Sequence, residues 1–398
     1  MRGRTAALLQ DLPARYLGEG SVGAPERVRI TAGRVSRDIV LSSDDCSVEP
    51  LDGHRPDAEI ITDPDTWCEI HEGRLSGIEA FAAKRLWARG SIDTLLRFET
   101  MFERPAAGGL SYEMAMVDVA GVRVSTLIVG PVDGRPLLLM HGLGATKASW
   151  LTVIPSLAGR YRVIVPDLPG FGASDKPSGR YDAPWFAIYG FSLLDVLGHR
   201  NAFVVGNSMG GRIAMEMAML GPERIDALAC LAPAAAFSKR PGLWLVKIAR
   251  PELGYALSRV PRRSLKAGLR QLFANSNRLD ESWYEAAVDD FLGAWNSPKA
   301  RTAFFKSLRN IYLDEPFGET GFWTRLETMV VAPALFIYGA NDPLITPRFG
   351  EKVQKALPKA RVETWPDCGH VPQLEHPERA REALMTFLAE AESRTSYG

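Results

Sequence analysis

From about residue 112 to its end, the chain alternates two kinds of hydrophobic pattern. Short continuous apolar runs, typical of strands buried on both faces of a sheet, are separated by longer segments with helical spacing. Two further extended runs flank Ala120-Gly121 and predict a hairpin within 112–130. The strand-like runs lie at 136–140, 162–165, 202–205, 227–231, 332–338 and 361–365. This alternation predicts an α/β fold with a mostly parallel central sheet flanked by helices.

One long segment interrupts the alternation. From about 237 to 322 the pattern is helical without strand-like runs, with helical stretches at 243–248, 265–273, 283–295 and 300–312. Such an insertion between two strands predicts a helical lid over the carboxyl edge of the sheet. It is rich in aromatic residues, and we expect most to form the lid's own core and some to line an apolar substrate cavity. These residues are Phe273, Trp283, Tyr284, Phe291, Trp295, Phe304 and Phe305.

The first 108 residues follow a different plan. Strand-like runs at 28–30, 39–41 and 59–61 precede a helical stretch at 78–85, an extended run at 86–88 and a second helix at 91–102. Ser91 or Asp93 stands where that second helix needs an N-cap. The composition of 104–109 is that of a short linker. We therefore predict a small α+β domain at 1–108 and an α/β domain at 112–398 with its lid at about 237–322.

Composition and charge argue against several classes of protein. Hydrophobic residues make up 46% of the chain and charged residues 24%, as in an ordinary globular protein with a sizeable core. The 47 basic residues balance the 47 acidic ones, so we expect no nucleic-acid partner. No window reaches the roughly 18 apolar residues of a membrane span. The apolar stretch behind the basic start stops at Leu9, too early for a signal peptide.

The four cysteines form no CxxC pair and share no metal-ligand spacing with histidine, so we expect no metal site. Cys230 lies in the apolar run 227–231, which predicts a buried, reduced thiol. Cys368 stands two residues before His370, so a functional role for its thiol is a minor alternative to a structural one. The other two are Cys46 and Cys68. This usage fits a reducing compartment, and we expect a cytoplasmic protein.

The strongest chemical signal lies between a strand and a helix. Gly206-Asn207-Ser208-Met209-Gly210 fits the pattern G-x-S-x-G, directly after the apolar run 202–205 and before a helical pattern at 212–220. In this context the serine sits on a sharp turn, and glycines at 206 and 210 remove collisions that side chains would cause. The helix that follows also directs its amide dipoles toward the hydroxyl. We therefore predict that Ser208 is a nucleophile rather than an ordinary helix cap.

A serine nucleophile needs a base that is oriented by a carboxylate. Among the six histidines, His370 follows the last predicted strand, and the glycine before it lets the ring reach back over the sheet edge. Asp342 follows the strand at 332–338, whereas the strand at 227–231 ends without a carboxylate. The chain order Ser208, Asp342, His370 is the order found in hydrolases whose nucleophilic serine stands on a G-x-S-x-G turn.

A fourth strand end supplies oxyanion donors. His141-Gly142-Leu143-Gly144 follows the run 136–140, and the backbone N–H of Leu143 should point at the developing oxyanion beside that of Met209. We expect His141 to be a structural hydrogen-bonding residue rather than a proton shuttle. Because these residues supply all the proton transfers, the chemistry implies no cofactor.

These motifs together resemble the signatures of the α/β-hydrolase superfamily across about 115–398. The loop 141–150 resembles that of bacterial lipases and carboxylesterases, and 206–211 also resembles the C–C bond hydrolases that cleave vinylogous diketones. Those hydrolases usually carry Gly-Pro-Gly after the His-Gly pair, which this chain lacks. A serine at 208 also departs from the aspartate nucleophile of epoxide hydrolases and haloalkane dehalogenases. The resemblance thus implies a serine esterase or lipase-like enzyme.

Residues of about 25–103 resemble the sterol-carrier-protein type of lipid-binding fold. The resemblance rests on 65–73, 80–85 and 86–91, a helix leading to a glycine, a second helix, and a short strand ending in glycine before a last helix. It implies binding of fatty-acyl or steroid-like ligands. An unrelated α+β domain used for docking or dimerisation is the alternative.

The sequence therefore predicts a serine hydrolase of lipophilic carboxylic esters that acts through an acyl-enzyme on Ser208. The alternatives are a C–C bond, thioester or cofactor-free perhydrolysis enzyme, or a lipid-binding protein without catalysis. We expect a small lipophilic ester as the binding partner. The sequence leaves open whether the protein contacts lipid surfaces peripherally and whether it forms a homo-oligomer. The sequence does not define the acyl group, the alcohol or the role of the first domain.

Overall fold

The computed structural model describes residues 2–18, 25–234, 250–256, 259–328 and 332–395 of the 398-residue chain. The chain forms two compact units, Met1–Met114 with Asp280–Gly293, and Ala115–Leu279 with Ala294–Gly398. The domain limits at 108, 112, 237 and 322 stay predictions. The helix expected at 243–248 lies outside the described residues.

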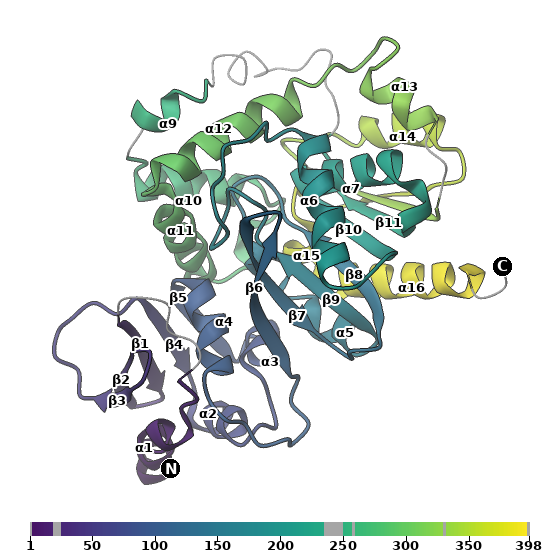
Figure 1. Cartoon of the computed structure of the whole chain (residues 1–398). Coiled ribbons are helices and arrows are strands. Elements are labelled where there is room, and N and C mark those ends of the chain that lie inside the picture. The colour runs from purple at the N-terminus through teal and green to yellow at the C-terminus, as the bar shows by residue number, and fades with distance from the viewer. Residues whose placement is uncertain (1, 19–24, 235–249, 257–258, 329–331, 396–398) are drawn as a thin grey trace. The chain divides into compact units, whose positions relative to one another are not determined.

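The first unit is built on a five-stranded sheet (Figure 1). Its order is β3-β2-β1-β4-β5, with β1 parallel to β4 and the other neighbours antiparallel. The elements before the second unit are α1 (Arg2–Gln10), η1 (Leu12–Arg15), β1 (Glu26–Ala32), β2 (Val35–Leu41), β3 (Cys46–Glu49), β4 (Ala58–Thr62), α2 (Pro64–His71), α3 (Gly77–Ala82), β5 (Leu86–Gly90) and α4 (Ile92–Thr100). The strands and helices expected from the sequence are therefore present, and β3, α1 and η1 are additional.

Side chains at the ends of helices in this unit satisfy backbone amides. Ser91 caps α4 by accepting a hydrogen bond from the Thr94 amide, which selects it over Asp93 as the N-cap. Ser76 and Glu79 form a reciprocal capping box at α3. The helices pack on an apolar sheet face whose residues alternate along each strand, as in Val28, Ile30 and Ala32 of β1.

The segment expected to be a linker is attached to the first unit. The Gly109 amide donates to Gly73 O at 2.9 Å, and the Leu110 amide donates to Glu79 at 2.9 Å. Tyr112 donates its hydroxyl proton to Glu99 Oε2 at 3.0 Å. A turn-forming composition therefore marked a break in the secondary structure, and these hydrogen bonds fix the segment in place.

The second unit contains an eight-stranded sheet of order β13-β12-β11-β10-β8-β9-β7-β6. The strands are β6 (Tyr112–Val119), β7 (Val122–Val129), β8 (Arg135–Met140), β9 (Tyr161–Pro166), β10 (Ala202–Asn207), β11 (Ile225–Leu231), β12 (Ala334–Gly339) and β13 (Arg361–Trp365). All pairs from β13 to β9 are parallel, and β7 pairs antiparallel with β9. The mostly parallel sheet predicted from the apolar runs is confirmed.

The central strands are buried on both faces because helices cover each one. Leu138, Met140 and Val204 belong to the core that includes α6 (Ala183–Val196) and α7 (Met209–Leu220), which lie against each other in Figure 1. Leu137 and Leu139, equally buried, alternate with them and point to the opposite face. The continuous apolar runs in the sequence follow from this double coverage.

The remaining elements in the described part of the second unit are helical. They are η2 (Lys147–Trp150), α5 (Ile154–Ala158), η3 (Pro222–Arg224), α9 (Leu253–Ala256), α10 (Arg262–Gln271), η4 (Ser276–Arg278), α12 (Pro298–Tyr312), α13 (Phe322–Glu327), α14 (Arg348–Ala356), α15 (Pro372–Glu375) and α16 (Pro377–Thr395). Helix α11 (Glu281–Trp295) falls largely within the first unit by its contacts. None of the described helices is long and apolar enough to cross a membrane.

Aromatic residues at the end of α11 and within α12 pack against one another. The rings of Trp295, Phe304 and Phe305 lie with their centroids 5.4 to 5.9 Å apart in edge-to-face geometry. These three therefore form helical core, as expected for most aromatics of the insertion. That others line a substrate cavity stays a prediction.

Candidate active site

Ser208 occupies a strained turn between β10 and α7. Its backbone has φ 53° and ψ −113°, a region that costs a non-glycine residue about 1–3 kcal/mol. A side chain at Gly206 would lie 2.2 Å from Gly210, and one at Gly210 would lie 2.1 Å from Met140 O. Both glycines are thus required by close backbone approaches. Although Ser208 stands at the N-cap of α7, its hydroxyl makes no capping hydrogen bond.

The loop after β8 lies beside this turn. A Cβ atom at Gly142 would be 3.4 Å from Ser208 Cβ, so the loop and the turn are in contact. Met209 is the first residue of α7, and its amide therefore has no partner within the helix. Within the described residues, neither this amide nor that of Leu143 donates to a protein acceptor. Two backbone donors thus remain available near the Ser208 hydroxyl.

His370 and Asp342 are brought together from the ends of β13 and β12. His370 Nδ1 lies 2.8 Å from Asp342 Oδ2, and both side chains are buried. The other carboxylate oxygen, Oδ1, accepts the amides of Leu344 at 2.6 Å and Ile345 at 2.8 Å. Since a carboxylate can only accept, Nδ1 carries the proton and Nε2 is left as an acceptor.

The side chain of Asn207 connects the turn to the histidine loop. Its Nδ2 donates to Leu231 O at 3.0 Å and to His370 O at 3.1 Å. Within the described residues, the hydrogen bond of Ser208 Oγ is to Tyr312 OH at 3.2 Å and not to His370. The structure therefore places the serine beside the histidine segment without a direct bond between the two side chains. Such bonds often tighten only when substrate binds.

His141 is held as a neutral, structural residue. Its Nδ1 donates to Gly142 O at 2.8 Å, and its Nε2 accepts from the Leu168 amide at 2.9 Å. Complete burial lowers the pKa of this imidazole, outweighing the nearby carboxylate of Asp167. Both ring nitrogens are therefore used in joining two loops. This arrangement is consistent with the structural role expected from the sequence.

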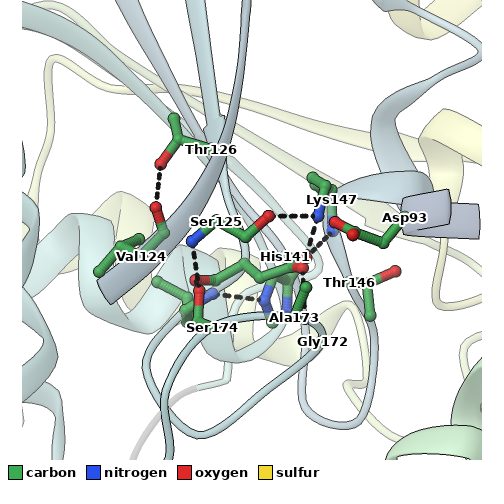
Figure 2. A network of polar contacts seen from close by, with 12 residues as sticks. Asp93, Val124, Ser125, Thr126, His141, Thr146, Lys147, Gly172, Ala173 and Ser174 are labelled. Atoms are coloured by element: carbon green, nitrogen blue, oxygen red, sulfur yellow. Dashed lines mark hydrogen bonds and ion pairs between the residues drawn. The ribbon is translucent and has the colours of Figure 1, made fainter. Parts of the chain in front are cut away.

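A buried ion pair stabilises the loop that carries Leu143 (Figure 2). Lys147 Nζ lies 2.6 Å from Asp167 Oδ2 and donates to Ser125 Oγ at 3.0 Å. The Lys147 amide donates to Asp167 Oδ1 at 2.8 Å. Asp167 O accepts from Ser174 Oγ at 2.6 Å, which in turn accepts from the Ser125 amide. Because both charged side chains are almost fully buried, Asp167 depends on Lys147 for its electrostatic compensation.

Replacing Lys147 by methionine should lower the free energy of unfolding by about 3–5 kcal/mol, because Asp167 would remain as a buried, unpaired carboxylate. Urea unfolding followed by tryptophan fluorescence measures the change. Exposed Lys299 offers a matched control, and Lys299→Met should change stability by less than about 0.5 kcal/mol. Equal midpoints for the two variants would contradict the role assigned to the pair.

Glu375 fixes the position of the histidine loop. Its Oε2 accepts the Gly369 amide at 2.7 Å and the Ala274 amide at 3.2 Å, and its Oε1 accepts the Asn275 amide at 2.8 Å. The His370 amide donates to Leu272 O at 2.7 Å. One buried carboxylate thus attaches the segment bearing His370 to the segment that follows α10.

The described residues contain one group with ligand atoms close enough for a metal ion. Cys368, Glu375 and His376 bring such atoms within 4.8 Å of one another. Both oxygens of Glu375 are used by backbone amides, and burial raises the pKa of the Cys368 thiol to about 12. The group is therefore poorly suited to hold a metal, and Cys368 is poorly suited to act as a nucleophile.

The sequence did not identify Tyr312 or Glu375 as parts of the site, nor Arg212, which pairs with Glu216 of α7 and with Asp314 just beyond Tyr312. Tyr312 lies within a helical pattern that predicts α12. That pattern does not determine which side of the helix faces Ser208. Glu375 stands beside His376 at a helix start and looks like a capping residue. The one available signal was the isolated pair Arg212 and Glu216 in an otherwise apolar helix.

Comparison with known families agrees with this geometry. Residues 135–377, more than half of the chain, match the model of the alpha/beta hydrolase fold, so the chain belongs to that family. Residues 22–103 match the model of the SCP-2 sterol transfer family. The protein is thus an alpha/beta hydrolase with an amino-terminal SCP2-like domain, and both resemblances seen in the sequence are confirmed.

The proteins that this chain resembles include a hydrolase, a lipase and a phospholipase. The chain is 29% identical over 281 residues to a 2-hydroxymuconate semialdehyde hydrolase of Pseudomonas sp. (strain CF600), covering 69% of this chain and 93% of that protein. It is 29% identical over 264 residues to Lipase 3 of Moraxella sp. (strain TA144), covering 61% and 74%. Among solved structures, a membrane phospholipase A, described as a bacterial virulence factor, matches with TM-score 0.60 and 28% identity, covering 71% and 87%.

Proposed function

We propose that this protein is a serine hydrolase that cleaves lipophilic carboxylic esters through an acyl-enzyme on Ser208. The observation that carries the proposal is that a strained serine turn lies beside the His370–Asp342 pair at one edge of the sheet. Within that pair, His370 Nδ1 lies 2.8 Å from Asp342 Oδ2. Ser208 attacks the ester carbonyl while His370 Nε2 takes its proton. The Leu143 and Met209 amides hold the oxyanion, and water then releases the acid.

The ester is favoured over other substrates by three features. The lipase and the phospholipase among the relatives support ester chemistry. The loop at 141–150 lacks the Gly-Pro-Gly of C–C bond hydrolases. The SCP2-like domain supports a lipophilic substrate. A lipid-binding protein without catalysis has no use for a strained serine and a buried His–Asp pair, whose assembly costs stability.

We also propose a cytoplasmic location, supported by four free, buried cysteines.

Substrate comparison with the full-length wild-type protein tests the proposal. We expect kcat/KM for p-nitrophenyl butyrate or decanoate to exceed that for butyryl-CoA or a vinylogous 1,5-diketone by at least about tenfold. A fluorophosphonate should label Ser208, as located by mass spectrometry. Faster cleavage of the diketone would favour the C–C hydrolase. No turnover of any substrate and no labelling would favour the binding protein.

A further inference from the structure

The last residue of α12 contacts the nucleophile. Tyr312 OH lies 3.2 Å from Ser208 Oγ, although 104 residues separate the two in the chain. The tyrosine ring is partly buried and packs against the core that also contains Met209 and Ile213 of α7. Tyr312 is therefore a polar group from the helical insertion that touches the reacting atom itself.

The chemistry of the serine oxygen decides which hydroxyl is the donor. When Ser208 transfers its proton to His370, its Oγ proton points at the imidazole, and the lone pairs of Oγ are left to accept. In an acyl-enzyme, Oγ is an ester oxygen with no proton at all. In both states, a hydrogen bond between the two oxygens therefore requires Tyr312 OH to be the donor.

A charged cluster holds the end of α12 on the nucleophile helix. Arg212 Nη1 donates to Glu216 Oε2 at 2.6 Å, and its Nη2 donates to Asp314 Oδ2 at 2.6 Å. Arg325 pairs with the other oxygen of Glu216 and lies 3.7 Å from Asp314. Asp314 is only two residues beyond Tyr312. Two positive and two negative charges thus compensate one another and fix the segment next to Tyr312.

Within the second unit, α12 is attached at further points. Lys306 Nζ donates to Gly179 O at 3.1 Å, and Asn310 donates to Arg180 O. A side chain at Gly170 would meet Ala303 at 2.8 Å, so the loop before α6 packs closely against α12. These contacts and the charged cluster set the helix in position along its length. The Tyr312 hydroxyl is consequently supplied by a preorganised element.

We propose that Tyr312 is a further catalytic residue, whose hydroxyl stabilises Ser208 Oγ when it leaves the acyl group during deacylation. The proposal rests on the ester hydrolysis proposed above. Water adds to the acyl carbon and gives a proton to His370. The C–Oγ bond then breaks, its electron pair stays on Oγ, and His370 returns a proton to that oxygen. Tyr312 donates a hydrogen bond throughout and keeps its own proton.

Replacing Tyr312 by phenylalanine keeps the packed ring and removes only the donor. We expect deacylation to slow by about 10- to 100-fold, because a hydrogen bond to a charged oxygen is lost. Acylation should change by less, because the serine hydroxyl of the free enzyme already accepts this hydrogen bond before it attacks, whereas an ester oxygen accepts it only weakly. Stopped-flow release of p-nitrophenol from p-nitrophenyl butyrate should then show a burst of about one equivalent, followed by slow turnover. Intact-protein mass spectrometry should detect the accumulated butyryl-enzyme.

Two further variants separate this role from a structural one. Exposed Tyr255 of α9 provides the matched control, and Tyr255→Phe should leave burst and steady-state rates unchanged. Asp314→Asn should produce the same burst pattern more weakly, because it loosens the segment beside Tyr312. Its effect should shrink when Tyr312 is already phenylalanine, since both changes act on one hydrogen bond.

The outcomes distinguish this inference from the proposed function. An active wild type with unchanged turnover in Tyr312→Phe would overturn the role of Tyr312 alone. So would a loss confined to acylation, with no accumulated acyl-enzyme. A wild type that neither hydrolyses the ester nor is labelled at Ser208 would overturn the ester hydrolase and this role together.

Discussion

Replacing Ser208 by alanine should lower kcat for p-nitrophenyl butyrate by about 10⁶-fold, because no other group at the site can form the acyl-enzyme. The nearby Tyr312 hydroxyl serves as a hydrogen-bond donor to Ser208 Oγ and keeps its own proton in the mechanism proposed above. Cys368 does not substitute, since burial raises the pKa of its thiol to about 12. The residual rate should reflect the oxyanion donors and binding alone.

Steady-state rates and covalent labelling measure this loss independently. Exposed Ser393, whose hydroxyl donates to Glu390 O in its own helix, supplies the control variant Ser393→Ala. That variant should keep full activity and full labelling by a fluorophosphonate. Activity of Ser208→Ala within about tenfold of wild type would exclude the acyl-enzyme mechanism.

The sequence predicted the sheet and the strand ends well for a physical reason. A parallel strand covered by helices on both faces must be apolar throughout, so runs such as 202–205 and 227–231 stand out from helical periodicity. The need for glycine at positions 206 and 210 was also predictable, because a side chain at either position would lie about 2 Å from backbone atoms. Such requirements are local and therefore leave a clear trace in the sequence.

Contacts that depend on the placement of distant elements left no such trace. Tyr312 faces Ser208 because of how α12 is set against α7, and neither helix pattern encodes that placement. The three amides held by Glu375 come from segments about 100 residues and 6 residues away, which spacing does not bring together. Arg212 and Glu216 stood out as charges in an apolar helix, but their partner Asp314 was hidden in a turn.

The helical insertion contributes to the site at two places within the second unit. Tyr312 reaches the nucleophile, and Leu272 O accepts the amide of His370 itself. A side chain at Gly369 would lie 2.2 Å from Leu272 O, which shows how closely the two segments approach. Substitutions in α12 and in the segment that follows α10 should therefore alter kcat as well as substrate selection, since these two parts help position the nucleophile and the base.

Asp342→Asn should lower kcat by about 10⁴-fold at neutral pH, with KM little changed. In the structure, Asp342 Oδ1 accepts the amides of Leu344 and Ile345, while Oδ2 accepts His370 Nδ1. An asparagine must place its single oxygen on the two backbone donors, because its NH₂ cannot accept. The NH₂ then faces His370 Nδ1 and donates to it, so the ring proton moves to Nε2. Since that nitrogen must receive the serine proton, the base is held in the inactive tautomer.

This argument separates a tautomer effect from a loss of structure. Because the backbone amides keep their acceptor, thermal unfolding of Asp342→Asn should match that of Asp133→Asn, a control in an exposed turn. ¹⁵N NMR of the histidine rings should report a protonated Nε2 at position 370 in the variant and a protonated Nδ1 in the wild type. Wild-type kcat in the variant would mean that the carboxylate pair does not orient the base. An unchanged tautomer with reduced kcat would instead assign Asp342 to stabilising the charged imidazolium.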